Sequence, residues 1–122
     1  MKFDFNSTKP LFQQVNDEIE AAILSGAFPE ESQVPSTTEI SKSFQINPAT
    51  VLKGMNLLVD HDLLEKKRGI GMFVKTGAQA KVKTIRKDKF LHESVVTVVK
   101  QAQALGITEA ELKELIERGY QQ

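Results

Sequence analysis

Two helix starts lie close together in the middle of this chain, and their spacing is the feature that most constrains its fold. Residues 36–39, STTE, form a capping box, in which Ser36 accepts a hydrogen bond from the backbone of Glu39 and the Glu39 side chain reaches back. The second start is Asn47-Pro48, because asparagine is a favoured N-cap and proline is tolerated at the first helical position. Two helices joined by a turn of a few residues predict a helix-turn-helix.

The flanking segments extend this motif to a winged helix. Residues 10–25 repeat apolar side chains at helical spacing, with Pro10 at the start and Gly26 at the exit. A turn-rich loop is expected over residues 28–36. Residues 63–74 predict a basic β-hairpin that contains two glycines in its turn. We therefore predict a mainly α fold with a small β-hairpin, in which an N-terminal winged helix-turn-helix is followed by a short helical tail.

The chain changes character after residue 76, so we divide it into a winged helix (1–76) and a tail (77–122). The tail is expected to begin with a polar, basic connector, GAQAKVKT, and to continue with a long helix from about residue 86 to 105. A second capping box, TEAE at residues 108–111, opens a final helix. The apolar side chains of these two helices are Phe90, Leu91, Val95, Val98, Val99, Ala102, Leu105, Leu112, Leu115 and Ile116. They are too many to leave in water, so they pack either onto the winged helix of the same chain or onto a second subunit.

Composition indicates an ordinary globular protein and leaves a nucleic-acid partner open. The formal net charge is zero, yet residues 77–101 carry six Lys/Arg against two Asp/Glu, and residues 34–76 carry six against four. Local charge matters more than the total, because salt limits exposed charges to a reach of roughly 8–10 Å. Cysteine is absent, and no apolar stretch approaches the roughly 18 residues of a membrane span. A cytoplasmic protein that does not enter the membrane is expected.

Enzyme signatures and metal-ligand patterns are missing from the sequence. His61 and His92 are the only histidines, and neither belongs to an H-E-x-x-H arrangement. There is no cysteine nucleophile, no G-x-S-x-G elbow and no phosphate-cradling G-x-x-x-x-G-K loop. We expect neither catalysis, nor a metal site, nor a cofactor.

Four segments resemble the GntR family of transcriptional regulators. PLFQQVNDEIEAAILSGAF, VPSTTEISKSFQINPATVLKGMNLL and DHDLLEKKRGIGMFV are similar to its winged-helix domain, and LGITEAELKELI is similar to its YtrA-like branch. The resemblance implies a bacterial homodimer that binds a roughly palindromic DNA operator, acts as a repressor and dimerises through its tail. The 46 residues after Thr76 are too few for the ligand-binding domain of most relatives, so an effector, if there is one, would bind between domains or at the dimer seam.

The helix that begins at Pro48 is the candidate recognition helix. Such a helix enters the major groove with its N-terminal residues nearest the bases, which explains the small, polar start NPAT. Lys53 is on the same face, three residues beyond Thr50. The complete set of candidate DNA-binding residues is Ser36, Thr37, Thr38, Asn47, Pro48, Ala49, Thr50, Lys53, Lys66, Lys67, Arg68 and Gly69.

Simpler roles compete at several of these positions. Ser36 and Asn47 serve as helix caps whether or not they touch DNA, and Lys53 could be an ordinary solvated lysine. The hairpin with its basic turn could likewise be solvated, without contact to DNA. Thr38 stands where the family usually has arginine, and Leu57 and Val59 stand where relatives tend to be polar. The alternative function is a winged helix whose exposed surface binds another protein.

Overall fold

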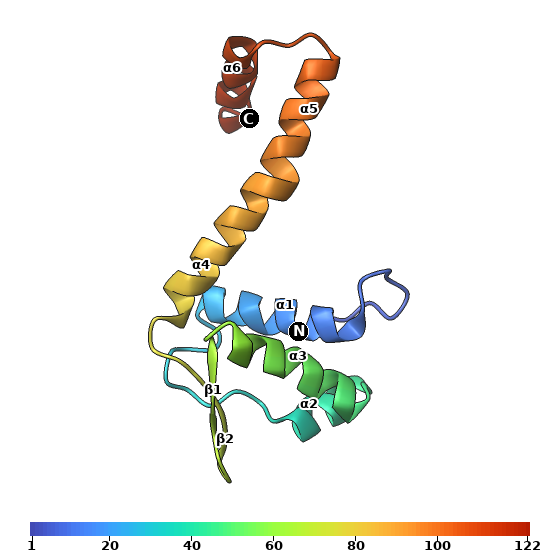
Figure 1. The fold of residues 1–122 in the computed structure, drawn as a ribbon, viewed down its shortest axis with the longest axis vertical. Coiled ribbons are helices and arrows are strands. Elements are labelled where there is room, and N and C mark those ends of the chain that lie inside the picture. Colours follow the sequence, from blue (N-terminus) through green and yellow to red (C-terminus); the bar gives the residue numbers. More distant parts are fainter. The chain divides into compact units, whose positions relative to one another are not determined.

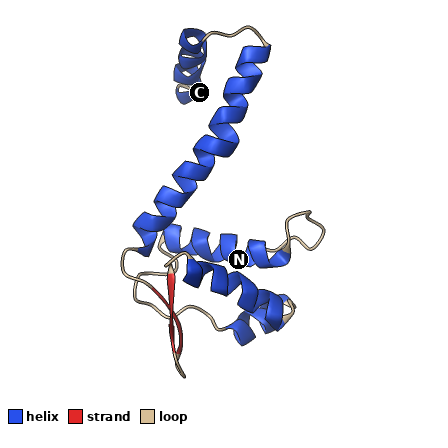
Figure 2. Cartoon of the chain, in the orientation of Figure 1, coloured by secondary structure: helices blue, strands red, loops and turns tan.

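The computed structural model describes all residues, 1–122, and has the predicted mainly helical architecture with one β-hairpin (Figures 1 and 2). In chain order the elements are α1 (Leu11–Ser25), α2 (Thr37–Phe44), α3 (Pro48–Asp60), β1 (Leu64–Lys67), β2 (Gly71–Val74), α4 (Ala78–Lys89), the π-helix η1 (Phe90–Val95), α5 (Val96–Ala104) and α6 (Glu109–Tyr120). The chain forms two compact units, Met1–Lys83 and Thr84–Gln122. The first is a winged helix-turn-helix, as predicted.

The predicted helix caps are present. Ser36 accepts from the backbone N–H of Glu39, whose side chain accepts from the backbone N–H of Ser36, so α2 begins with a complete capping box. Thr108 and Glu111 make the same two bonds at the start of α6. Gly26 ends α1 with a φ of 85°, in the left-handed region that glycine adopts without strain. The local sequence therefore fixes where these helices begin and end.

Helices α1 and α3 pack directly against each other and form the centre of the first unit. The fully buried side chains at this contact are Val15, Ile19 and Ile23 of α1 and Val51, Met55 and Leu58 of α3. Gly54 lies at a tight contact of the two helices: a Cβ atom at this position would be 2.6 Å from the backbone oxygen of Phe12 and 2.7 Å from the Cβ of Val15. The missing side chain of Gly54 thus sets the separation of α1 and α3.

The hairpin has a third partner that the sequence analysis did not anticipate. β1 and β2 pair antiparallel, with Leu64 opposite Val74. Residues 31–34, expected to be loop, also pair with β2: the N–H of Glu31 donates to the carbonyl of Val74, and the N–H of Val34 donates to that of Met72. The polar residues and prolines of this segment do not look like a strand. The pairing uses backbone N–H and C=O groups, which every residue type except proline carries in full. The segment between α1 and α2 is therefore part of the wing.

The predicted connector at residues 77–84 is also helical, so this expectation was wrong. Helix α4 begins at Ala78, and both Ala78 and Val82 are fully buried in the first unit. The physical reason is that alanine, glutamine and lysine favour helix and that two apolar residues spaced by four form a short buried stripe. The first unit consequently reaches Lys83, beyond the expected boundary at Thr76, and the helical segments α4, η1 and α5 follow one another without interruption.

Asp62 connects three parts of the first unit. It follows α3 with a φ of 61°, and its carboxylate pairs with Lys75, just after β2, and with Lys81 of α4. The hydrogen bonds from Lys75 and then Lys81 lower the pKa of Asp62 to about 2. The exit of α3, the exit of the hairpin and the start of α4 therefore meet at one carboxylate.

Candidate nucleic-acid interface

The N-terminal end of α3 is an exposed surface of small residues. Asn47, Pro48 and Ala49 are exposed, and Thr50 is half-buried. The Asn47 side-chain oxygen accepts from the N–H of Ala49 at 2.8 Å, which leaves its amide nitrogen available as a donor. The first N–H groups of a helix carry a partial positive charge, so this end of α3 attracts phosphate.

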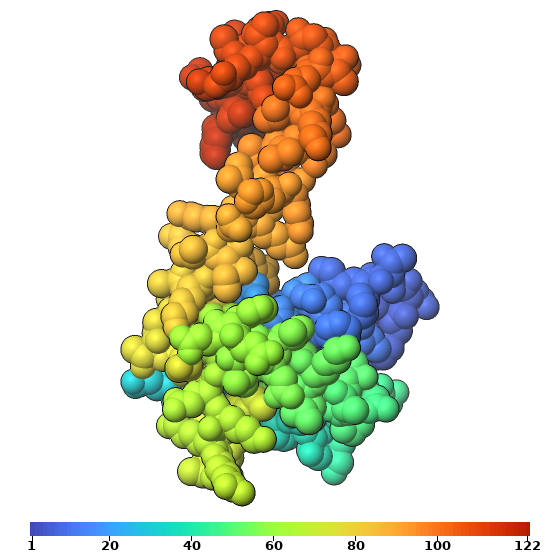
Figure 3. All heavy atoms as spheres, viewed as in Figure 1, coloured from blue at the N-terminus to red at the C-terminus, as the bar shows by residue number.

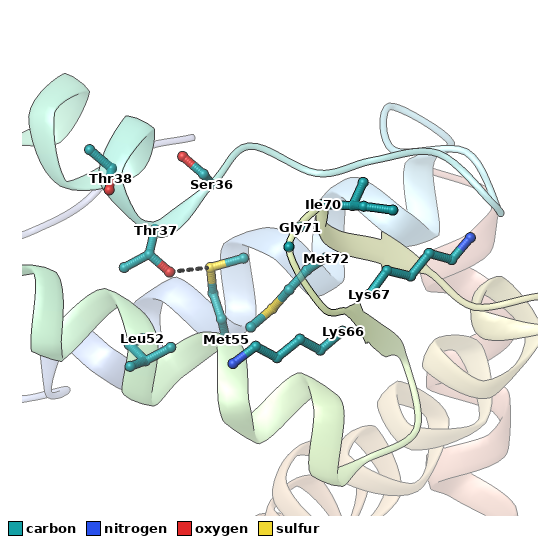
Figure 4. Close-up of a pocket in the computed structure, with 11 residues that line it drawn as sticks. Ser36, Thr37, Thr38, Leu52, Met55, Lys66, Lys67, Ile70, Gly71 and Met72 are labelled. Atoms are coloured by element: carbon teal, nitrogen blue, oxygen red, sulfur yellow. Dashed lines mark hydrogen bonds between the residues drawn. The ribbon is translucent and has the colours of Figure 1, made fainter.

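The start of α2 presents its three candidate residues in different ways. Ser36 forms the helix cap. The Thr37 hydroxyl points inward to the Met55 sulfur at 3.5 Å, as Figure 4 shows, while Thr38 is exposed. Ser36 and Thr38 are thus both exposed, but the Ser36 hydroxyl already accepts the capping bond from Glu39.

A groove separates the start of α2 from α3 and the hairpin (Figure 4). Its volume is about 330 Å³, and its lining includes Thr37, Thr38, Leu52, Met55, Lys66 and Ile70. The groove thus brings candidate residues of α2 and the hairpin together, and α3 contributes Leu52 and Met55 to it, not the predicted residues at its start. Figure 3 shows the hairpin as the yellow-green projection of the first unit's surface.

The two lysines of β1 lie on opposite faces of the hairpin, because side chains alternate along a strand. Lys66 is opposite Met72 and extends toward the groove and Leu52. Lys67 also contributes to the lining of the groove, but the end of its side chain lies over Phe73, with its Nζ 4.3 Å from the centre of the ring. The two lysines, adjacent in the sequence, therefore do not form one basic cluster in the structure.

The turn of the hairpin is held by a contact from outside it. Gly69 has a φ of 76°, and the N–H of Ile70 donates to the carbonyl of Lys67. The Gln33 side chain donates to the carbonyl of Ile70 at 3.0 Å. Arg68, exposed at the tip, therefore extends from a tethered turn and not from a free loop.

Lys53 does not line the groove. Its Nζ lies 4.0 Å from the centre of the Phe12 ring, so the predicted basic residue of α3 rests on an aromatic side chain of α1. Lys53 is exposed and Phe12 is half-buried. This contact between residues 41 positions apart could not be read from either helix alone.

Sequence reasoning missed exposed residues near the groove. Leu52 is 40% exposed and Ile70 is 64% exposed, although both are apolar. Leu52 and Asn56 lie three and seven residues beyond Ala49, which is the helical spacing of one face. That spacing was the available signal, and the apolar character of Leu52 concealed it.

The apolar side chains of the second unit are mostly uncovered. Phe90 is 62% exposed and Leu105 is 76% exposed, and the exposed set also includes Leu91, Val95, Val98, Val99, Leu115 and Ile116. Leu112 is half-buried. Ala102 differs, because it is only 4% exposed within its own chain. A small side chain spaced by helical turns from exposed valines can be covered locally by the chain itself.

No group of three or more His, Cys, Asp or Glu side chains is arranged to hold a metal ion. Every helix is too short or too polar to span a bilayer.

Comparison with known proteins places the chain in a family. Residues 11–74 match the family described as bacterial regulatory proteins, gntR family. The HTH-type transcriptional regulator YhcF of Bacillus subtilis is 28% identical over 114 residues, which cover 93% of each protein. A crystal structure of a transcriptional regulator of the GntR family from Bacteroides thetaiotaomicron is 32% identical, with a TM-score of 0.76 over 91% of this chain and 96% of that one.

Two further structures are similar to this chain, and one of them contains DNA. YtrA from Sulfolobus acidocaldarius, a GntR-family transcription factor, is 22% identical with a TM-score of 0.60, over 99% of this chain and 97% of that one, so it shares the fold. The DNA-binding domain of AraR, solved in complex with operator ORR3, is 28% identical with a TM-score of 0.53, over 61% of this chain and 92% of that domain. Together with the family match, these similarities show that the chain belongs to the GntR family of DNA-binding transcriptional regulators.

Proposed function

We propose that the protein is a homodimeric repressor that binds a palindromic operator through the start of α3, the start of α2 and the hairpin. The observation that carries this proposal is the groove in which Thr38, Lys66 and the exposed face of α3 meet. The groove brings donors for phosphate next to Leu52, about one helical turn beyond the small start of α3 that can approach base edges.

The first residues of α3 are assigned to base recognition. Pro48 and Ala49 allow close approach, and an alanine methyl can contact a thymine methyl in the major groove. The free amide nitrogen of Asn47 and the hydroxyl of Thr50 can bond to a base edge or a phosphate. Lys53, at the side of the same helix, is assigned to a phosphate or a guanine.

The start of α2 and the hairpin are assigned to the DNA backbone. Thr38 and Lys66 face the groove, and Arg68 is at the tip of the wing, where it can reach a phosphate or enter a narrow minor groove. The operator complex of the AraR domain supports this use of the fold. These residues add affinity and fix the register on the duplex.

Dimerisation is assigned to the second unit. Its exposed apolar residues on η1, α5 and α6 leave water if two copies meet, and burial of each such side chain is worth roughly 1.5–3 kcal/mol. A two-fold dimer presents two identical recognition helices, so its operator is palindromic. A bound dimer would occupy promoter DNA and exclude polymerase. Because its proposed partner is the bacterial chromosome, the protein is assigned to the cytoplasm.

Selection from random duplex DNA tests the proposal. We expect a two-fold symmetric sequence whose half-sites are about 34 Å apart, or a multiple of that. Light scattering should give twice the chain mass of 13.6 kDa. Transcription in vitro from a promoter carrying the selected site should fall when protein is added. A monomer that selects no DNA sequence would contradict the proposed operator binding as a homodimer. An increase in transcript would contradict the role as a repressor.

A further inference from the structure

We propose that Phe12 is a positioning residue for DNA binding, which acts by holding the Lys53 ammonium beside the recognition helix. This inference rests on the proposed function, because it takes Lys53 as a residue that contacts DNA. Phe12 itself need not touch the duplex.

The geometry is that of a cation–π contact. The Nζ of Lys53 lies 4.0 Å from the centre of the Phe12 ring, well within the roughly 6 Å at which such contacts are significant. The face of the ring carries partial negative charge and attracts the ammonium. Because Lys53 remains exposed, its other N–H donors can still reach a phosphate oxygen.

The backbone that carries the ring lies at a tight contact between two helices. Gly54, the residue after Lys53, packs so tightly against α1 that an added Cβ would meet the backbone oxygen of Phe12 at 2.6 Å. The backbones of Phe12 and Lys53 are therefore part of one rigid contact between α1 and α3. The ring and the lysine therefore project from backbone positions that are fixed relative to each other.

Holding the lysine before DNA arrives should increase affinity. A long exposed side chain loses rotamer freedom when it binds a phosphate, and a side chain already held over a ring has less to lose. Exposed cation–π contacts have strengths that correspond to about two- to fivefold in a binding constant. We expect an effect of this size from removal of the ring.

A double-mutant cycle measures whether Phe12 acts through Lys53. The four proteins are the wild type, Phe12→Leu, Lys53→Met and the double variant, titrated with a fluorescent duplex selected from random DNA by the wild type. Phe12→Leu should weaken binding about two- to fivefold in the wild-type background and have no further effect in the Lys53→Met background. Phe12→Tyr, which keeps the ring, should retain affinity, and Phe28→Leu, beyond the opposite end of α1, is the matched control.

Two measurements remain informative if Phe12→Leu folds poorly. A fluorinated phenylalanine at position 12 keeps the shape of the ring and removes the negative charge of its face, so it should reproduce the loss. In the free wild-type protein, the ε-methylene protons of Lys53 should be shifted upfield by the ring, and this NMR shift should vanish in Phe12→Leu.

Three results would overturn the inference: wild-type affinity of Phe12→Leu beside a weakened Lys53→Met, an equal loss in both backgrounds, or an unshifted Lys53 signal in the wild type. Failure of the proposed function is distinguishable, because then the wild-type protein itself would select no duplex, whereas the NMR shift would still report the contact.

Discussion

Lys66 and Lys67 are adjacent in the sequence, yet their side chains lie on opposite faces of the hairpin. Lys66 extends toward the groove beside α3, and Lys67 rests on the ring of Phe73. The alternation of a β-strand produces this division. The two lysines should therefore differ in their importance for DNA binding, although they carry the same charge.

Lys66→Ala should weaken operator binding more than Lys67→Ala. Each lost phosphate contact also lowers the slope of log affinity against log salt by about 0.9. Fluorescence anisotropy titrations of both variants at several salt concentrations give affinity and slope together. Equal losses for the two variants would mean that net charge on the wing, and not the direction of Lys66, determines binding.

Gly54→Ala should destabilise the first unit despite the higher helix propensity of alanine. Propensity favours alanine by about 0.8–1.0 kcal/mol, but crowding of a tight core contact costs about 1–3 kcal/mol. The obstacle is the backbone oxygen of Phe12, which cannot rotate away as a side chain can. Urea unfolding followed by circular dichroism measures the change.

The control is Gly119→Ala in α6, because a Cβ at Gly119 would meet nothing within 4 Å. This variant should leave stability unchanged or slightly higher. If Gly54→Ala were as stable as the wild type, the close contact of α1 and α3 would not constrain the position of α3.

Val95→Asp should convert the protein into a monomer with weak operator affinity. A carboxylate at this exposed valine of η1 would have to lose its water when two apolar surfaces meet. Light scattering reports the mass, and a titration with the selected duplex reports the affinity. Thr97→Asp is the matched control, since helical spacing turns residue 97 away from the valine face and its substitution should leave the dimer intact. A dimeric Val95→Asp would exclude this surface as the seam.

Stability should depend on pH through Asp62. Its pKa is about 2 in the folded protein, below the ordinary value of 3.8, because Lys75 and Lys81 favour the ionised form. The contribution is therefore complete above the ordinary pKa and is lost as the pH falls from about 4 through about 2. Asp62→Asn should melt at a lower temperature than the wild type at neutral pH, and the difference should disappear at the acid end. The carboxylate is exposed, so the difference should be small.

Much of the fold is encoded in local signals. The helix ends depend on neighbouring residues, and the structure contains those that were predicted: the capping boxes at Ser36 and Thr108, the Asn47 cap and the exit at Gly26. Such bonds span a few residues, so a linear reading of the sequence can find them. The candidate surface of α3 was identified in the same way.

The contacts between distant segments could not be predicted. Three of them depend on how the elements pack: the contact of Lys53 with the Phe12 ring, the hydrogen bond from Gln33 to the carbonyl of Ile70, and the direction of the Lys66 side chain. The start of α4 was missed for a related reason: Ala78 and Val82 look like linker residues until a core is present to cover them. Local chemistry fixed the ends of the helices, and tertiary packing decided which residues meet.

The backbone pairing of residues 31–34 with β2 has a consequence for engineering. Successive residues of an extended segment point to opposite sides, so deleting one residue here would turn buried Val34 toward solvent and leave polar Gln33 facing inward. A chimera that transfers the DNA-reading module to another regulator should therefore exchange this segment and the hairpin as one block, with its length unchanged.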